Sequence, residues 1–423
     1  MTTVHIKNDL TGQFNIEASD STVILHKGVT IDSAANGVDE AATFSGSTIV
    51  IAGNITTSGL FSTGIRSRGA GADITVAETG RLSGAYGITA TGDNALVVNE
   101  GRIVSENRAI LINGEDSRFI NHGTTVSHSG AAFETGQVAS FAFLNDGRMV
   151  GKTGLDFHAG DLKAVFGEDS VVKAGNHTIV TNTADGDTAR IVNHGTLAAT
   201  VEDTFPEAIV GGAGSENIRN DGLIRGQVIL GDGADRYDGR GGRVTDGVVE
   251  GGAGNDQFYL SDGGTRVVEG IGGGYDRLTV SFSYKLEAFN EIEEIRLAGR
   301  GDFRLTGNMQ NNYLVGNASD NRLFGGDGQD GLFGGKGDDI LTGGAGGDGF
   351  YFKPHAGRET VTDFTDGEDF LVFVPGKDIT DMQDLLDHHL KQTHGGLLIS
   401  GDGTEMLLKG MHKADLGFDD FIT

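Results

Sequence analysis

A series of Asp and Asn side chains at nine-residue intervals is the feature of the sequence that could do chemistry. Between residues 307 and 351 a glycine-rich nonapeptide recurs in register, and its sixth position is always Asn or Asp. These residues are Asn312, Asn321, Asp330, Asp339 and Asp348. Carboxylates stacked at this spacing repel one another unless a cation lies between them. Oxygen-rich, acidic turns of this kind suit a hard divalent ion such as calcium.

The eighth position of each nonapeptide is a large apolar residue, which requires a buried stack of strands to accommodate it. These residues are Leu314, Leu323, Leu332, Leu341 and Phe350. The repeat therefore predicts short strands that alternate with tight turns, and the turns hold the acidic side chains.

Composition and charge agree with a turn-rich β-protein. The chain has 423 residues, of which 71 are Gly and only 3 are Pro, and it contains no Cys. Disulfides and thiolate metal sites are therefore excluded. The net charge of −28 disfavours nucleic acid and anionic membranes as partners. No run of about 18 apolar residues occurs, so we expect no membrane insertion.

The N-terminal half contains a longer repeat, marked by Asn-x-Gly. The marking glycines recur at intervals of about 21 to 27 residues, which suits rungs of three short strands. They include Gly101, Gly123, Gly147, Gly195 and Gly222, with one double interval between Gly147 and Gly195. Alternation of apolar and polar residues places Leu82, Ile88, Leu96 and Val98 inward, and positive φ angles are expected at the Asn and Gly corners. A parallel β-helix is favoured, with an antiparallel sandwich as the alternative.

The nonapeptides resemble the calcium-binding β-roll repeats of repeats-in-toxin (RTX) proteins. In that family each ion lies between turns on the same side, two repeats apart. The resemblance implies one calcium site and a second, weaker one in which Asn replaces Asp. The first would use Gly326, Gly328, Asp330, Gly343, Ala345 and Asp348. The second would use Gly334, Lys336 (through its carbonyl), Asp339, Asn317, Ser319 and Asn321.

Looser copies of the motif precede the strict repeats, and one acidic phrase follows them. Asp235, Asp256 and Asp276 lie about twenty residues apart in glycine-rich phrases. We expect them to be further calcium ligands, although a solvated turn carboxylate remains the alternative for Asp235 and Asp276. Asp369 ends a phrase similar to the cap of such β-rolls and is also expected to be a calcium ligand.

The C-terminal region contains helical spacing and then an acidic, hydrophobic tail. Residues 379–390 are predicted to be helical, with Thr380 and Gln383 able to form a capping box. The tail, residues 416–423, resembles the export address of the family, so type I secretion machinery is an expected partner. The absence of an apolar N-terminal segment agrees with export by that route.

No sequence signature assigns an enzymatic activity. His-Glu-x-x-His and Gly-x-Ser-x-Gly are both absent, which argues against a zinc protease and the usual lipase. A polysaccharide lyase or epimerase on a β-helix remains an alternative. Its candidate residues would be His122, His128, His158, His177 and His194. The first and last of these occupy a variable corner position, so an enzyme is the less favoured interpretation.

The sequence therefore predicts an all-β protein in which a parallel β-helix continues into a calcium-binding parallel β-roll with a short cap and helix. We expect a secreted structural or adhesive protein, such as an adhesin or surface-layer protein of a bacterial cell surface or matrix. Its partners would be calcium and either further copies of itself or a surface polysaccharide. The expected regions are the β-helix (1–225), degenerate repeats (226–306), the RTX β-roll (307–352) and the cap with its secretion tail (353–423).

Overall fold

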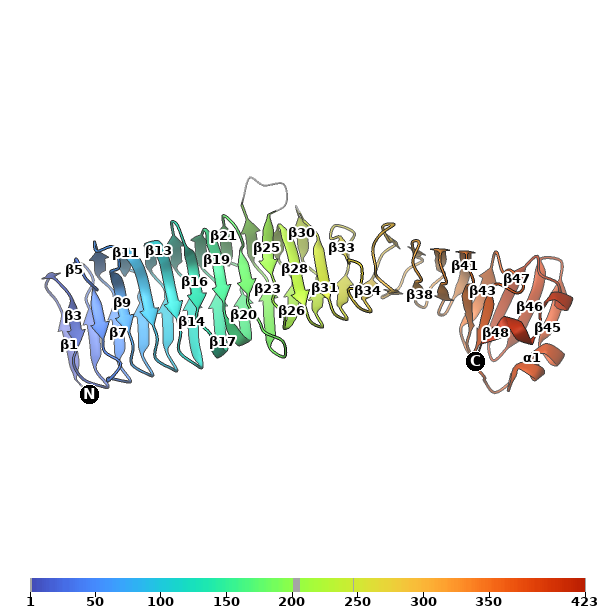
Figure 1. Cartoon of the computed structure of the whole chain (residues 1–423), viewed down its shortest axis with the longest axis horizontal. Coiled ribbons are helices and arrows are strands. Elements are labelled where there is room, and N and C mark those ends of the chain that lie inside the picture. The colour runs from blue at the N-terminus through green and yellow to red at the C-terminus, as the bar shows by residue number, and fades with distance from the viewer. Residues whose placement is uncertain (1, 201–205, 246, 423) are drawn as a thin grey trace. The chain divides into compact units, whose positions relative to one another are not determined.

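The computed structural model describes residues 2–200, 206–245 and 247–422. The chain forms two compact units. Unit 1 comprises Met1–Gly252 with Gly264–Arg266, and unit 2 comprises Ala253–Gly263 with Val267–Thr423. Short parallel strands that follow one another as successive rungs dominate both units (Figure 1). The predicted all-β solenoid is confirmed, and the antiparallel sandwich is wrong because neighbouring strands in the repeats pair in parallel.

Unit 1 is a parallel β-helix with three sides, and each rung contributes a strand to each side. The first side contains β1 (Thr3–Ile6), β4 (Thr22–Leu25), β7 (Thr48–Ile51), β10 (Asp73–Val76), β12 (Leu96–Asn99), β14 (Ser117–Asn121), β17 (Val138–Asn145), β20 (Ala159–Phe166), β23 (Thr188–Asn193), β26 (Ser215–Asn220) and β29 (Arg236–Asp238). The second contains β2 (Leu10–Thr11), β5 (Thr30–Ser33), β8 (Asn54–Thr57), β11 (Arg81–Ala90), β13 (Arg102–Ile112), β15 (Thr124–Ser127), β18 (Arg148–Gly151), β21 (Val171–Ala174), β24 (Thr196–Ala199), β27 (Leu223–Arg225) and β30 (Arg243–Thr245).

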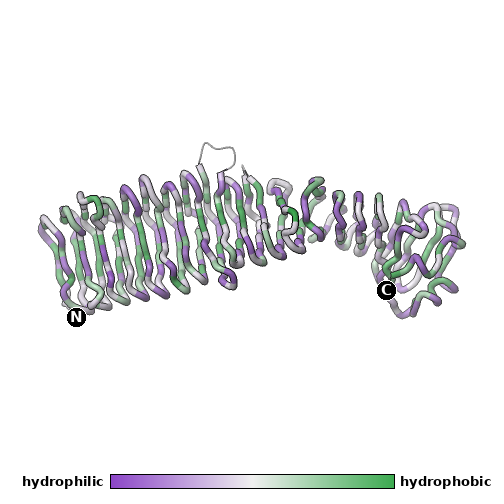
Figure 2. Tube along the Cα trace, in the orientation of Figure 1, coloured by the Kyte–Doolittle hydropathy of each residue, from purple (hydrophilic) through white to green (hydrophobic). Residues whose placement is uncertain are grey.

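The third side of unit 1 closes each rung. It contains β3 (Phe14–Ile16), β6 (Val38–Glu40), β9 (Thr63–Ser67), β16 (Ala131–Thr135), β19 (Thr153–Phe157), β22 (Ile179–Thr181), β25 (Glu207–Val210), β28 (Gln227–Asp232) and β31 (Val249–Ala253). The long strands β11 and β13 bend through both the second and the third side, since each pairs with separate strands at its two ends. Figure 2 shows apolar and polar residues alternating along the rungs.

The core of unit 1 follows this alternation. On the first side, however, the residues that face inward are not the ones that the sequence predicts. Leu82 and Ile88 are buried as predicted. The inward placement of Leu96 and Val98 is wrong, because Val97 and Asn99 are the residues that are fully buried there. A buried ladder of asparagines determines which residues of the first side face inward. A rule that places only apolar residues inside cannot predict such a ladder.

The asparagine ladder joins successive rungs through side-chain amides. Asn99 Nδ2 donates to Asn121 Oδ1 at 2.7 Å, and Asn121 Nδ2 donates to Asn145 Oδ1 at 2.6 Å. Gly28, at a weaker copy of the corner, has a positive φ of 83°, but these asparagines and Gly123 do not, so the prediction fails at the ladder. The glycine is required for a different reason: a Cβ there would lie 2.2 Å from the carbonyl oxygen of Gly101 on the preceding rung.

Replacing Asn121 with Ala is expected to lower the free energy of unfolding by about 2 kcal/mol, because it leaves buried amide partners on both sides without hydrogen bonds. Asn217, whose side chain is partly exposed on β26, provides the control, and Asn217→Ala should change stability by less than about 0.5 kcal/mol. Chemical denaturation of the full chain in calcium measures both. Equal effects of the two substitutions would contradict a stabilising ladder.

Most of unit 2 is a β-roll, in which each rung has two strands. One side contains β32 (Gln257–Leu260), β34 (Arg277–Val280), β36 (Glu294–Leu297), β38 (Tyr313–Val315), β40 (Gly331–Phe333), β42 (Gly349–Phe352), β44 (Phe370–Phe373) and β48 (Phe421–Ile422). The other contains β35 (Tyr284–Lys285), β37 (Arg304–Thr306), β39 (Arg322–Asp327), β41 (Asp338–Ala345), β43 (Gly357–Val361) and β47 (Thr404–Lys409). The short strand β33 (Val267–Val268) also belongs to this unit.

The apolar eighth positions of the nonapeptides form the core of the roll. Leu314 pairs with Leu332 and Leu332 with Phe350, while Leu323 pairs with Leu341 on the opposite side. Each of these side chains is at most 1% exposed. The predicted buried stack is therefore confirmed, and it fixes the register of the turns between the strands.

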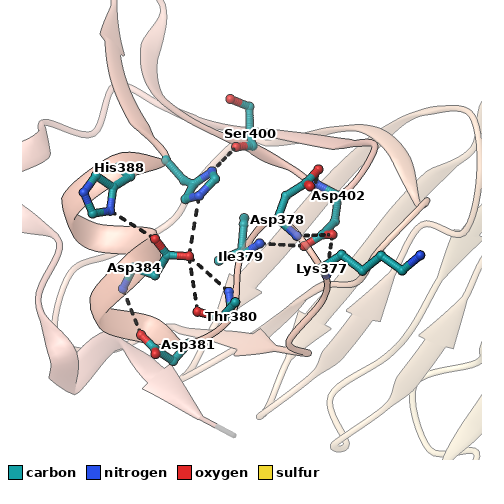
Figure 3. A network of polar contacts seen from close by, with 10 residues as sticks. Lys377, Asp378, Ile379, Thr380, Asp381, Asp384, His388, Ser400 and Asp402 are labelled. Atoms are coloured by element: carbon teal, nitrogen blue, oxygen red, sulfur yellow. Dashed lines mark hydrogen bonds and ion pairs between the residues drawn. The ribbon is translucent and has the colours of Figure 1, made fainter.

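A small cap follows the roll and contains helix α1 (Met382–His388), strands β45 (Leu390–Thr393) and β46 (Gly396–Gly401), and the 3-10 helices η1 (Lys413–Asp415) and η2 (Phe418–Asp420). The helix starts later than Thr380, because Asp381 is its N-cap and accepts a hydrogen bond from Asp384 N at 2.9 Å. The predicted capping box is therefore wrong. Asp402 accepts hydrogen bonds from the backbone N–H groups of Lys377, Asp378 and Ile379 and fixes the loop before the helix (Figure 3).

Candidate calcium sites

The sixth-position carboxylates of the nonapeptides lie in two buried columns, one on each side of the roll. Asp330 Oδ1 accepts a hydrogen bond from Asn312 N at 2.7 Å, and Asp348 Oδ1 accepts one from Asp330 N at 2.9 Å. The equivalent bond on the other side joins Asn321 N to Asp339 Oδ1 at 2.7 Å. Each carboxylate thus uses one oxygen to hold the rung before it.

The second oxygen of these carboxylates has no protein partner. Oδ2 of Asp330, Asp339 and Asp348 is buried without a hydrogen bond, and each of the three residues is at most 3% exposed. Leaving a buried carboxylate oxygen unsatisfied is costly. A Cβ on Gly343 would lie 2.1 Å from Asp348 Oδ2, so only glycine fits beside it. These oxygens fit a bound cation, which would supply the missing partner.

The first predicted site draws on turns that the structure places side by side. Gly326 pairs with Gly344, and Asp327 pairs with Ala345, so the turn of Asp330 lies directly against the turn of Asp348. This is the arrangement of turns two repeats apart that the resemblance to RTX repeats implies. The residues brought together are Gly326, Gly328, Asp330, Gly343, Ala345 and Asp348.

The second predicted site also draws on adjacent turns, but Asn321 changes its chemistry. Lys336 N donates to Asn317 O at 2.9 Å, which places the two turns together. Asn321 Nδ2 donates to Asn317 Oδ1 at 3.0 Å and to the carbonyl of Ser319. An amide thus occupies oxygens that a cation would need, in line with weaker binding on the Asn side. Gly334 and Asp339 lie on the other side of this site.

Glu359 on β43 is a candidate ligand that the sequence did not predict. It pairs with Asp339, is fully buried, and has no partner for either carboxylate oxygen. A Cβ on Gly334 would lie 2.4 Å from Glu359 Oε2 and 2.5 Å from Asp339 Oδ2, so the two carboxylates point at the same place. Gly357-Arg358-Glu359 does not match the nonapeptide. The only signal for Glu359 in the sequence is therefore its separation from Asp339 along the chain.

Burial raises the pKa of these carboxyl groups. The pKa of Asp330 rises to about 7 and those of Asp339 and Asp348 rise to about 6, from an ordinary value of 3.8; backbone hydrogen bonds oppose the increase. Burial and the neighbouring Asp339 raise the pKa of Glu359 to about 9. At neutral pH the ion-free roll therefore carries charges that its interior disfavours.

The ion-free protein is expected to lose stability as the pH rises from about 4 to about 7. These groups have a higher pKa in the folded chain than in the unfolded chain, so the folded state binds more protons across that range and loses stability as they ionise. Urea denaturation of the full chain in chelator at several pH values measures this. In excess calcium the trend should reverse, since protons then compete with the cation. A roll that becomes more stable with rising pH in chelator would contradict this account.

Asp369 extends the column of Asp330 and Asp348 into the end of the roll. Its Oδ1 accepts a hydrogen bond from Asp348 N at 2.9 Å, and its Oδ2 accepts one from Thr365 N at 2.8 Å. Both of its oxygens therefore have protein donors, and it closes the column that contains the first predicted site.

The three looser copies of the motif do not form one cluster in the structure. Asp256 and Asp276 come together with Glu269, and ligand atoms of all three buried residues lie within 4.8 Å of one another. Asp276 accepts a hydrogen bond from Asp256 N at 2.8 Å through Oδ1, and its Oδ2 is buried without a hydrogen bond. Asp235 lies in unit 1, where it accepts a hydrogen bond from Glu216 N at 2.8 Å.

The Glu269 cluster is expected to bind one calcium ion, and Glu269→Gln should lower the number of ions bound per chain by one or weaken one site at least about tenfold, because the change removes a charge from an all-oxygen cluster. Glu250→Gln, at an exposed position on β31, is the control. Calorimetric titration with calcium measures both. An unchanged number and affinity of sites in Glu269→Gln would exclude this cluster as a site.

The histidines that an enzyme would need lie at corners of unit 1 beside acids. His122 Nδ1 is 3.5 Å from Asp146 Oδ2, and His194 Nδ1 is 3.2 Å from Asp221 Oδ2. Each pair joins equivalent corner positions of neighbouring rungs. His128, His158 and His177 each lie within 3.5 Å of one carboxylate, which for His158 is Asp156 of the same rung. Within the described residues, no helix is long and apolar enough to cross a bilayer.

The fold and these turns define a parallel β-solenoid protein with calcium-binding repeats. The family model of RTX calcium-binding nonapeptide repeats, in four copies, matches residues 306–341 and 315–350. Residues 306–350 are therefore RTX calcium-binding repeats, and the chain also contains a parallel β-helix.

One solved structure aligns with part of this chain at low similarity. The extracellular lipase LipA from Serratia marcescens has 18% sequence identity, with a TM-score of 0.20; the match covers 57% of this chain and 41% of that protein. The chain thus spans about two fifths of the length of the lipase. No curated protein matches the sequence.

Proposed function

We propose that this chain is a secreted structural or adhesive protein of a bacterial cell surface or extracellular matrix, and that calcium drives its folding and assembly. The observation that carries this proposal is the set of buried, unpartnered oxygens on Asp330, Asp339 and Asp348. These oxygens lower the stability of the ion-free roll, and a bound cation would supply the partner that they lack.

The energetic effect of calcium on such a roll is large. An ion that binds only the folded state adds about 2.7 kcal/mol per site when its free concentration is 100 times the dissociation constant. Two or three sites therefore contribute as much as the typical total stability of a domain, about 5 to 15 kcal/mol. Where calcium is scarce the acidic turns repel one another, which favours an open chain suited to export by type I secretion machinery. Outside the cell, calcium would close the roll.

The structural role is supported by what the repeats provide, namely long parallel sheets with regular outward faces. Extended sheets and solenoid ends favour stacking with further copies or with a surface polymer.

Analytical ultracentrifugation of the full chain over a calcium titration tests the proposal. Folding and ordered self-association are expected to appear together as calcium increases, and magnesium at the same concentration should not replace it. A chain that folds in calcium but stays a monomer at all concentrations, and that fails to bind cell-surface material, would contradict the structural role. The alternative enzyme would then be tested by supplying acidic polysaccharides and assaying for unsaturated or epimerised uronate.

A further inference from the structure

A groove on the outer face of the roll has a charge opposite to that of the chain. It crosses β35, β37, β39 and β41 and has a volume of about 560 Å³, which is within the usual range for small-molecule sites. Its cations are Lys285, Arg304 and Arg322, and none of its described lining residues is acidic. The chain as a whole carries 60 acidic and 32 basic residues, so a groove lined only by cations and neutral residues stands out.

Arg304 and Arg322 lie side by side without a carboxylate. They pair directly across β37 and β39, whose strands are about 4.8 Å apart. Among the described residues neither side chain forms an ion pair, whereas Arg358 on the same sheet contacts Glu405 at 3.1 Å. Like charges directly opposite each other on a sheet destabilise it. Repulsion between the two guanidinium groups therefore destabilises the protein when no anion is bound. The same arrangement favours the binding of an anion that would bridge the two groups.

The remaining groove residues suit a sugar ring. Ser283, Thr306 and Thr342 offer hydroxyl groups, and Tyr284 and Phe324 offer aromatic surface. Phe324 is 42% exposed. The ring of Tyr284 packs edge-on against that of Phe282, with 6.0 Å between the two ring centroids. Guanidinium groups bind carboxylates through paired hydrogen bonds, while hydroxyls and aromatic faces match the polar edges and apolar faces of a pyranose.

A long polyphosphate is a poor fit to the same groove. The adjoining hollow, which shares Lys285, Thr306 and Phe324, also contains Glu287 and Asp327. A chain with a phosphate at every unit would meet these carboxylates after a short distance, whereas a short acidic saccharide would not.

We propose that this groove binds a uronic-acid oligosaccharide, with Arg304 and Arg322 holding a carboxylate. The inference rests on the adhesive role proposed above and names its partner. It also makes binding depend on calcium, because β39 bears Arg322 and Phe324 and then continues into Gly326, while β41 bears Thr342 and then continues into Gly343 and Ala345. The groove residues and the predicted calcium ligands therefore belong to the same strands.

Calorimetric binding of a galacturonic-acid trisaccharide to the full chain in calcium tests the proposal. Arg304→Gln and Arg322→Gln should each weaken binding at least about tenfold, since each removes a charge-assisted hydrogen bond. Arg358→Gln, which alters an exposed but ion-paired arginine of the same sheet, should leave binding unchanged. Chelator should abolish binding, and a neutral galactose trisaccharide should bind at least about tenfold more weakly.

Circular dichroism and thermal melting in calcium serve as the folding control. Removing one of two facing cations is expected to leave the melting temperature unchanged or raise it, and Arg322→Lys provides a second variant that keeps the charge without the planar fork. Undiminished binding in both Gln variants, or tighter binding of a single-stranded oligonucleotide than of the uronate, would overturn the proposal. If calcium folds the chain but no uronate binds, only this inference fails. If calcium changes neither fold nor assembly, the proposed function fails first.

Discussion

Chelation of calcium is expected to expose the amides of residues 307–352 to exchange while those of the β-helix in unit 1 stay protected. The roll would lose the cations that satisfy Asp330, Asp339 and Asp348, whereas the core of unit 1 is held by apolar residues and the asparagine ladder. Each site lost should speed exchange about 100-fold, the equivalent of about 2.7 kcal/mol. Hydrogen exchange measured by mass spectrometry on the full chain, with and without chelator, resolves the two regions.

The β-helix is the internal control in this experiment. Uniform loss of protection along the chain would indicate that calcium supports both units equally. Equal protection of residues 307–352 with and without chelator would contradict the role assigned to the buried carboxylates.

Asp330→Asn is expected to weaken calcium binding at one site at least about 100-fold and to lower the stability of the roll in calcium. The amide can keep the hydrogen bond from Asn312 N through its oxygen, but it puts an N–H donor where Oδ2 now lies and removes the charge. Because Asn321 already places an amide in the equivalent position of the other column, Asp330→Asn would copy that weaker arrangement. Calorimetric calcium titration measures the change.

Asp320→Asn provides the matched control for Asp330→Asn. Asp320 lies in the turn of the preceding repeat, is exposed, and accepts a hydrogen bond from Asp338 N at 2.8 Å that Asn can also accept. We expect its calcium affinity to change less than about twofold. Similar losses in both variants would mean that general acidity, rather than the buried oxygen, determines binding.

Much of the roll can be predicted from the sequence because its period is nearly strict. A nine-residue repeat with one apolar and one acidic position specifies which residue faces the core and which turn lies above which, as the pairing of Leu314 with Leu332 illustrates. In unit 1 the period varies. The rungs could still be located from Asn-x-Gly, but which residues of β12 face inward could not be predicted. The buried position of Asn99 depends on hydrogen bonds with the next rung, which local alternation does not encode.

The candidate sites were predictable only where they follow the motif. Glu359 and Glu269 reach the buried carboxylates through strands or loops that lack the nonapeptide, and only the register of the folded chain brings them beside Asp339 and Asp276. The facing arginines of the groove show the same limit. Arg304 and Arg322 are 18 residues apart, and their contact follows from the pairing of β37 with β39.

Equilibrium dialysis of the full chain against calcium, with circular dichroism recorded on the same samples, tests the central claim most directly. The account predicts that several calcium ions bind per chain and that β-structure increases in step with their binding, while Asp330→Asn binds fewer ions or binds them more weakly. Calcium binding without any change in β-structure, or no binding at concentrations that saturate other calcium-dependent β-rolls, would contradict a roll whose folding calcium drives.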